Sequence, residues 1–131
     1  MNDKEAVILT TQEAEKYLER AMPALKELIV STREFHNEDN IKDVGEAVEG
    51  LGWLSQYSHS MQHLVASGYP EMAGHFAQFE KDISFIISQM VEGSRNQDQV
   101  LIADIMEYEV MPLFEAMKEI IGQVLHKIRH H

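Results

Sequence analysis

Apolar residues recur every three or four positions along most of the chain, and this spacing predicts amphipathic helices rather than strands. Polar turns and turns that contain glycine or proline divide the pattern into segments that begin near residues 10, 40, 70 and 96. Four such helices joined by short turns are typical of an antiparallel up-down-up-down four-helix bundle. We therefore predict an all-α fold of this kind, with an N-terminal arm at residues 1–9 and the bundle at residues 10–131.

The ends of the predicted helices carry capping residues. Thr10 and Glu13 have the spacing of a capping box, so we expect the first helix to begin there. In the polar turn that follows this helix, Asp39 or Asn40 can cap the second helix. Pro70 suits the first turn of the third helix, because a proline there loses no hydrogen bond.

The last predicted helix, from Asn96 to about Arg129, is the longest, and we expect the other helices to pack along it. Its inner face is predicted to consist of Ile102, Ile105, Met106, Leu113, Met117, Ile120, Val124 and Ile128. The apolar series of the first helix ends at Phe35, and that of the second begins at Ile41. Both residues are therefore expected to face inward.

Two prolines lie inside the first and last predicted helices. Pro23 and Pro112 have no backbone N–H, so each leaves a carbonyl without its donor one turn earlier, at Glu19 and Tyr108. We expect both helices to bend near their middle.

The second predicted helix contains Gly45, Gly50 and Gly52. Each glycine costs about 1 kcal/mol relative to alanine in a helix interior. Two explanations are open: a neighbouring helix approaches closely at these positions, or the helix breaks near Gly50. A phosphate-binding loop is rejected because no strand precedes the glycines and their spacing is not that of a nucleotide motif.

The charge and composition exclude several classes of partner. Of the 131 residues, 22 are acidic and 11 are basic, and the net charge of −11 would repel nucleic acid. No stretch approaches the roughly 20 apolar residues of a membrane span, so no membrane partner is expected. The absence of cysteine rules out thiolate chemistry and suits a reducing compartment, and we expect a cytoplasmic protein.

Histidines are the first residues to consider as metal ligands. His59 and His63 have the i, i+4 spacing at which two imidazoles can share one ion. Both residues fall nearly opposite the apolar stripe of their helix, and the Glu-x-x-His motif of carboxylate-bridged di-iron bundles is absent from the sequence. We therefore expect no specific metal and no cofactor.

Glu109 is the most informative acidic residue. A regular helix places it inward, among Ile102, Ile105 and Leu113. A buried carboxylate needs a partner or a raised pKa. We expect Glu109 to accept a hydrogen bond from another helix and fix the register of packing, with a ligand-binding or catalytic acid as the alternative.

Large apolar side chains away from the main stripes are candidates for an interface. Trp53, Tyr57 and Leu64 share one flank of the second helix, and Phe85 lies nearly opposite the apolar stripe of the third. Such residues either widen the buried face or mark a contact with another subunit.

Two segments carry a family resemblance. Leu101–Leu113, together with Glu49–Leu54, resembles uncharacterised helical proteins of Gram-positive bacteria. The resemblance implies a helical fold and carries no known activity or site residues.

These observations lead to two hypotheses about function. The first is a non-enzymatic protein-interaction module, an adaptor or chaperone-like bundle that associates with itself or with an unknown protein partner. The alternative is a small-ligand binder or an enzyme that uses Glu109 inside the bundle.

Overall fold

The computed structural model describes residues 3–35 and 37–130, and these are helical apart from the short turns. The elements are α1 (Asp3–Glu34), α2 (Glu38–Val65), α3 (Pro70–Arg95), α4 (Gln99–Ile105), the π-helix η1 (Met106–Val110) and α5 (Met111–Arg129). No strand occurs in these two ranges. The prediction of an all-helical chain is confirmed.

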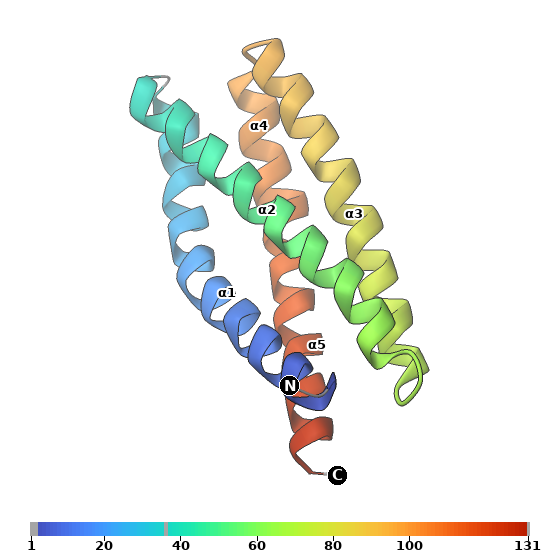
Figure 1. Cartoon of the computed structure of the whole chain (residues 1–131). Coiled ribbons are helices and arrows are strands. Elements are labelled where there is room, and N and C mark those ends of the chain that lie inside the picture. The colour runs from blue at the N-terminus through green and yellow to red at the C-terminus, as the bar shows by residue number, and fades with distance from the viewer. Residues whose placement is uncertain (1–2, 36, 131) are drawn as a thin grey trace.

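The helices pack side by side around one shared core. α2 lies along α3, α1 packs against α2, α4 and α5, and α3 also packs against α4 and α5 (Figure 1). The N- and C-terminal ends of the chain lie near the same end of the molecule (Figure 1). None of the described helices is long and apolar enough to cross a membrane.

The apolar stripe of the last predicted helix is buried, as expected, and α1 and α3 pack along this helix, whereas α2 packs mainly against α1 and α3. All of its predicted inner residues, from Ile102 to Ile128, are buried. The series fails near the turn between α1 and α2, where Phe35 is 56% exposed and Ile41 is 54% exposed. Both residues lie at helix ends. The apolar spacing continues there in the sequence, but no neighbouring helix among those described covers the side chains.

The first helix begins earlier than the capping residues predict. α1 begins at Asp3, so residues 3–9 are helical rather than a separate arm, and Thr10 does not mark the start. Val7 and Thr11 are both buried, and they extend the four-three spacing of Ala14 and Leu18 toward the N-terminus. Burial of Val7 and Thr11 explains the longer helix.

Side-chain caps close two of the turns. The side chain of Asn37, rather than Asp39 or Asn40, caps α2 by accepting a hydrogen bond of 2.9 Å from the N–H of Asn40. Asp98 caps α4 by accepting a hydrogen bond of 3.0 Å from the N–H of Leu101. α3 begins at Pro70, as predicted.

The two glycine explanations can now be separated. α2 continues without a break through Gly50, and a methyl group there would overlap the side chain of Tyr17 on α1. Gly45 and Gly52 face open space. Close approach therefore explains Gly50, and the alternative of a broken helix is wrong.

Pro112 changes the path of the last helical segment. The N–H of Met111 donates to the carbonyl of Met106, five residues earlier, which is the pattern of a π-helix. Pro112 cannot donate to Tyr108, so the wider turn before it accommodates the missing hydrogen bond. One extra residue in a turn rotates the side chains beyond it by about 100° relative to a regular α-helix.

Candidate functional site

A broad groove lies between α1 and α2, and we call it the α1–α2 groove. It has a volume of about 540 Å³, which falls within the range of roughly 300–1,000 Å³ found for ligand sites. Its apolar lining comes from Leu25 and Leu28 of α1, Val110 of η1 and Phe114 of α5. Two further elements, η1 and α5, therefore contribute to the floor between the two helices.

Small side chains keep the groove open. Ala21 and Ala24 of α1 face the groove together with Ala47 of α2. α1 curves along its length and contains Pro23, which breaks its hydrogen-bond ladder as predicted (Figure 1).

The polar lining of the groove is mostly acidic. Glu27 of α1 and both Asp43 and Glu46 of α2 are exposed carboxylates, whereas Arg20 is the one basic residue among the described residues that line the groove. Arg20 lies over the ring of Tyr17, with its guanidinium carbon 5.9 Å from the ring centre. The groove thus combines an apolar floor with a negatively charged rim.

Aromatic rings close one end of the groove. The ring centre of Tyr17 lies 6.0 Å from that of Trp53 and 6.4 Å from that of Phe114. Burial raises the pKa of the Tyr17 phenol, and the positive charge of Arg20 acts in the opposite direction. Trp53, an interface candidate, is 36% exposed beside the groove.

Tyr57 lies in the core, which matches the first of the two alternatives for these off-stripe residues, a wider buried face. It is only 3% exposed, it stacks against Trp53 at 6.0 Å, and its hydroxyl lies 2.9 Å from the hydroxyl of Thr11 on α1. Burial raises the pKa of Tyr57 well above its ordinary value, and the hydrogen bond with Thr11 opposes this shift. The packing of α1 against α2 widened the buried face beyond the apolar stripe.

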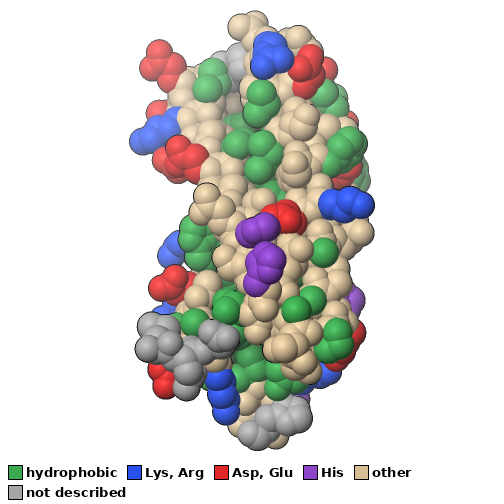
Figure 2. Space-filling model, turned by 45° about the vertical axis from the view of Figure 1, so that its right-hand side comes forward, with side chains coloured by type: hydrophobic (Ala, Val, Ile, Leu, Met, Phe, Trp, Pro, Cys, Tyr) green, Lys and Arg blue, Asp and Glu red, His purple; other side chains and the backbone are tan. Residues whose placement is uncertain are grey.

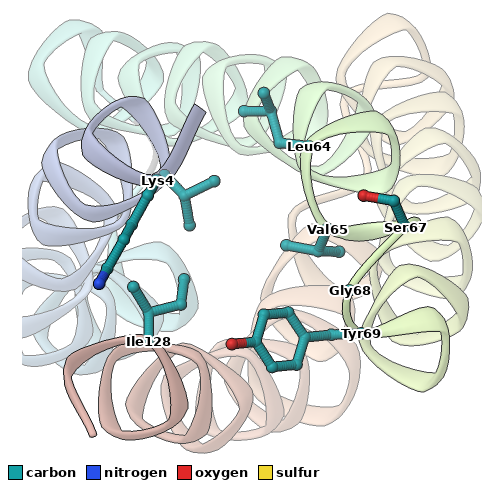
Figure 3. A pocket seen from close by; sticks show the side chains of 8 residues that line it. Lys4, Leu64, Val65, Ser67, Gly68, Tyr69 and Ile128 are labelled. Carbon is teal, nitrogen blue, oxygen red and sulfur yellow. The ribbon is translucent and has the colours of Figure 1, made fainter. Parts of the chain in front are cut away.

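The other two interface candidates lie far from the α1–α2 groove. Leu64 is half-buried in a pocket of about 220 Å³, where Lys4, Tyr69 and Ile128 also surround the opening (Figure 3). Phe85 of α3 is 59% exposed. The four candidates therefore do not form one patch, and their role as an interface stays a prediction.

Glu109 lies in the wall of a second depression, which we call the α3–α5 cleft. This cleft has a volume of about 340 Å³ and includes Phe85 and Asp82 of α3 together with Pro112 and Leu113 of α5. Glu109 is half-buried, and no hydrogen bond or ion pair of its carboxylate is found among the described residues. The expected hydrogen bond to another helix is therefore wrong, because the π-helix turns Glu109 away from the core.

An ion-pair network fastens α1 to the π-helix region. The guanidinium of Arg33 donates to Asp104 at 2.9 Å and to Glu107 at 3.2 Å. These two hydrogen bonds raise the pKa of Arg33. A hydrogen bond with Tyr108 and then the one from Arg33 lower the pKa of the Glu107 carboxyl. Exposed pairs of this kind orient side chains and contribute little to stability.

His59 and His63 are exposed, as expected from their helix face. Nδ1 of His59 lies 2.9 Å from a carboxylate oxygen of Glu80 on α3, and the two imidazole rings are 5.1 Å apart. Figure 2 shows histidine side chains beside an acidic one about midway along this face. In the described part of the chain, no group of three or more histidine and carboxylate side chains could hold a metal ion, and the absence of a specific metal stays a prediction.

The structure is that of an all-helical protein, with no strand in the residues that it describes. The chain belongs to the family described as Domain of unknown function (DUF8042), whose model matches residues 10–120. This match supports the expected membership of an uncharacterised family, while the Gram-positive origin stays a prediction. No curated protein and no solved structure matches the chain.

Sequence reasoning missed the residues that line the α1–α2 groove. From the sequence, Glu27, Asp43 and Glu46 were counted only in the net charge, because a single sequence does not show which faces of two helices lie against each other. The available signal was the alanines among the larger apolar residues, at Ala21, Ala24 and Ala47. Small residues at facing positions indicate either close helix packing or an open groove.

Proposed function

We propose that the protein is a non-enzymatic interaction module that binds a basic amphipathic helix of a partner protein in the α1–α2 groove. The observation that carries the proposal is the apolar floor of this groove beneath an acidic rim. As part of the proposal, the groove lies on an antiparallel up-down-up-down four-helix bundle that works in the cytoplasm. Both expectations come from the sequence.

The length of the groove supports a helical ligand. The lining residues of α1 extend from Tyr17 to Ser31, which corresponds to roughly 20 Å along the helix axis. A helix bound in this way would insert apolar side chains at positions i, i+3, i+4 and i+7. The alanines on both sides of the groove would let its backbone approach closely.

The charges of the groove select the chemistry of the partner. Glu27, Asp43 and Glu46 form no ion pair or hydrogen bond within the described residues, so their charges are available to a partner. Lysine and arginine residues that flank the apolar face of a helix would complement them. The net charge of −11 would also speed the approach of such a partner. A second copy of this chain would bring the same negative charge, which disfavours it as the occupant.

The polar groups of the described residues that line the α1–α2 groove do not form a catalytic pair, and the alternative function that uses Glu109 concerns the α3–α5 cleft instead. The hydroxyl of Ser31 donates to the carbonyl of Leu28 at 3.1 Å and accepts from the side chain of Asn40 at 3.3 Å. Of the described residues that line this groove, none is a histidine or a cysteine. A nucleophile–base pair of the usual kind is therefore not assembled there.

A synthetic peptide tests the proposal directly. The probe is a lysine- and leucine-containing peptide of about 18 residues, patterned as an amphipathic helix and free of tryptophan and tyrosine. Trp53 is the only tryptophan of the chain and lies at the end of the groove, so its fluorescence reports binding alongside calorimetry. A peptide of the same composition with scrambled order is the control for simple charge attraction.

Matched charge reversals locate the binding site. The Asp43→Lys, Glu46→Lys variant should weaken peptide binding at least tenfold, because both carboxylates line the groove. The Glu115→Lys, Glu119→Lys variant changes the net charge equally at exposed positions of α5 and should stay within about threefold of the wild type. Equal weakening by both variants, or equal binding of the scrambled peptide, would contradict the proposal.

Self-association stays a separate prediction that light scattering tests. If the wild-type protein is a dimer and filling the groove with Ala47→Phe makes it a monomer, a second copy occupies the groove. That result would replace the proposed partner helix. Peptide binding by a monomer, abolished by Ala47→Phe in a folded variant, supports the proposal.

A further inference from the structure

The α3–α5 cleft has a chemistry of its own, independent of the α1–α2 groove. Its floor is apolar, because Phe79, Ile86 and Leu113 are all buried there. Carboxylates enter from both sides, Asp82 from α3 and Glu109 from the π-helix. Among the described residues that line it, none is basic. The cleft is therefore a small apolar depression with negative charge on opposite walls.

The two carboxylates differ in their surroundings. Asp82 accepts a hydrogen bond of 2.9 Å from the side-chain amide of Gln78 on its own helix. Glu109 has no such partner among the described residues and is held half-buried by the rotation that the π-helix imposes. Single π-turns within α-helices occur frequently at functional sites, where they re-aim a side chain.

Phe85 adds an aromatic surface to the same cleft. Its ring is 59% exposed, although a phenylalanine gains stability when its ring is removed from water. The ring belongs to the same lining as Asp82 and Glu109. The face of an aromatic ring attracts a cation, and its apolar edge and face also contact hydrocarbon.

We propose that the α3–α5 cleft binds a small organic cation, an ammonium group joined to an apolar chain or ring. The carboxylates of Glu109 and Asp82 would pair with the ammonium, and the apolar body would cover Phe85 and the floor of the cleft. A bare metal ion does not fit this chemistry, because the apolar floor and the phenyl ring offer it no ligands. A neutral or anionic ligand would leave the carboxylates unpaired in a partly apolar site.

Three probes that share one ring separate the contributions of charge and hydrocarbon. Phenethylammonium is the cation, phenethyl alcohol is its neutral counterpart and phenylacetate is an anion. Each is titrated into the ¹⁵N-labelled full chain in salt of about 0.15 M, where long-range attraction is screened beyond about 8 Å. The cation should produce saturable shifts centred on residues 79–86 and 109–116, and the other two probes should not.

Conservative substitutions decide whether the cleft is responsible. Glu109→Gln keeps the shape of the side chain and should weaken binding of phenethylammonium at least tenfold. Glu115→Gln removes the same charge from an exposed position on the neighbouring helix and should change binding less than twofold. Circular dichroism checks that both variants remain folded.

Three outcomes would overturn the proposal. Equal binding of phenethyl alcohol would show that the cleft recognises only hydrocarbon. Equal weakening by Glu109→Gln and Glu115→Gln would show diffuse attraction to an acidic protein. Shifts that do not saturate, or that map away from the cleft, would show that no site exists. Each outcome leaves the peptide experiment on the α1–α2 groove unaffected, because the two sites use different residues.

Discussion

The buried hydrogen bond between Thr11 and Tyr57 joins α1 to α2 and offers a sharp test of how the core is stabilised. The two hydroxyl oxygens are 2.9 Å apart, and the hydroxyl of Thr11 also lies 3.8 Å from the sulfur of Met61. Tyr57→Phe keeps the stacking on Trp53 and the edge contact of 5.7 Å with Phe76, and it removes only the hydroxyl. Because Thr11 is completely buried, its hydroxyl would lose its oxygen partner without gaining water.

The expected loss follows from that unsatisfied group. Tyr57→Phe should lower the free energy of unfolding by about 1–3 kcal/mol, and Thr11→Val should do the same by leaving the Tyr57 hydroxyl unpaired. The double variant removes both polar groups, so it should lose at least about 1 kcal/mol less than the sum of the single losses. Urea unfolding of the wild type, the two single variants and the double variant measures these free energies. Additive losses would refute the reasoning.

The same residue predicts a pH dependence. Burial raises the pKa of Tyr57 in the folded chain above its unfolded value of about 10. Folding therefore favours the protonated phenol. Its contribution to the free energy of unfolding is complete below about pH 10 and is lost as the pH rises further. The slope should approach 1.4 kcal/mol per pH unit for one tyrosine, at about 25 °C. Tyr57→Phe should reduce this slope, with a remainder from the partly buried Tyr17, and an unchanged slope would exclude Tyr57 as the cause.

Three further predictions concern single sites and are measured by urea unfolding. Gly50→Ala should destabilise the protein by about 1–3 kcal/mol, because the added methyl group meets Tyr17. Gly52→Ala faces open space and should be neutral or stabilise the protein by up to about 1 kcal/mol. Equal effects of the two substitutions would show that Tyr17 moves freely. Ser58→Ala should stabilise the fold by about 1 kcal/mol, since the buried hydroxyl has no hydrogen-bond partner within the described residues, and a loss would reveal a hidden partner. Glu109→Gln should change stability by less than about 0.5 kcal/mol, and a loss above about 1 kcal/mol would restore the structural role first expected of Glu109.

Periodicity predicted the fold wherever each helix face has a neighbour along its whole length. The inner face of the last segment was predicted correctly from Ile102 to Ile128, although a proline and a π-turn lie between them. The same rule failed at Phe35 and Ile41, because periodicity does not report where a neighbouring helix ends. The apolar spacing also extends to Val7, but the capping box at Thr10 was taken as the start of the first helix, which in fact begins at Asp3.

The candidate sites were harder to predict, because each is formed by two or more helices. The wheel of one helix could not decide whether the flank that contains Tyr57 is buried or exposed, and the structure shows that α1 covers Tyr57 through Thr11. The α1–α2 groove depends on which alanines face one another, and that pairing is absent from a single sequence. Phe85 was recognised as unusual because it lies nearly opposite the apolar stripe of its helix. The structure places it in the same cleft as Glu109, a combination that helical wheels drawn separately cannot show.

Pro112 explains both why the expectation for Glu109 was wrong and how the α3–α5 cleft obtains its carboxylate. The sequence indicated that this proline leaves the carbonyl of Tyr108 without its donor, and a bend was expected. The helix widens into a π-turn at Met106–Val110, which adds a residue while apolar side chains on both sides remain packed, and the bend stays a prediction. Val110 and Met111 take the buried positions, and Glu109 moves to the wall of the cleft. The π-turn thus keeps the core intact while it presents, in the same cleft as Phe85, a carboxylate that has no partner within the described residues. For this reason the cleft is a better candidate for a ligand than for a structural contact.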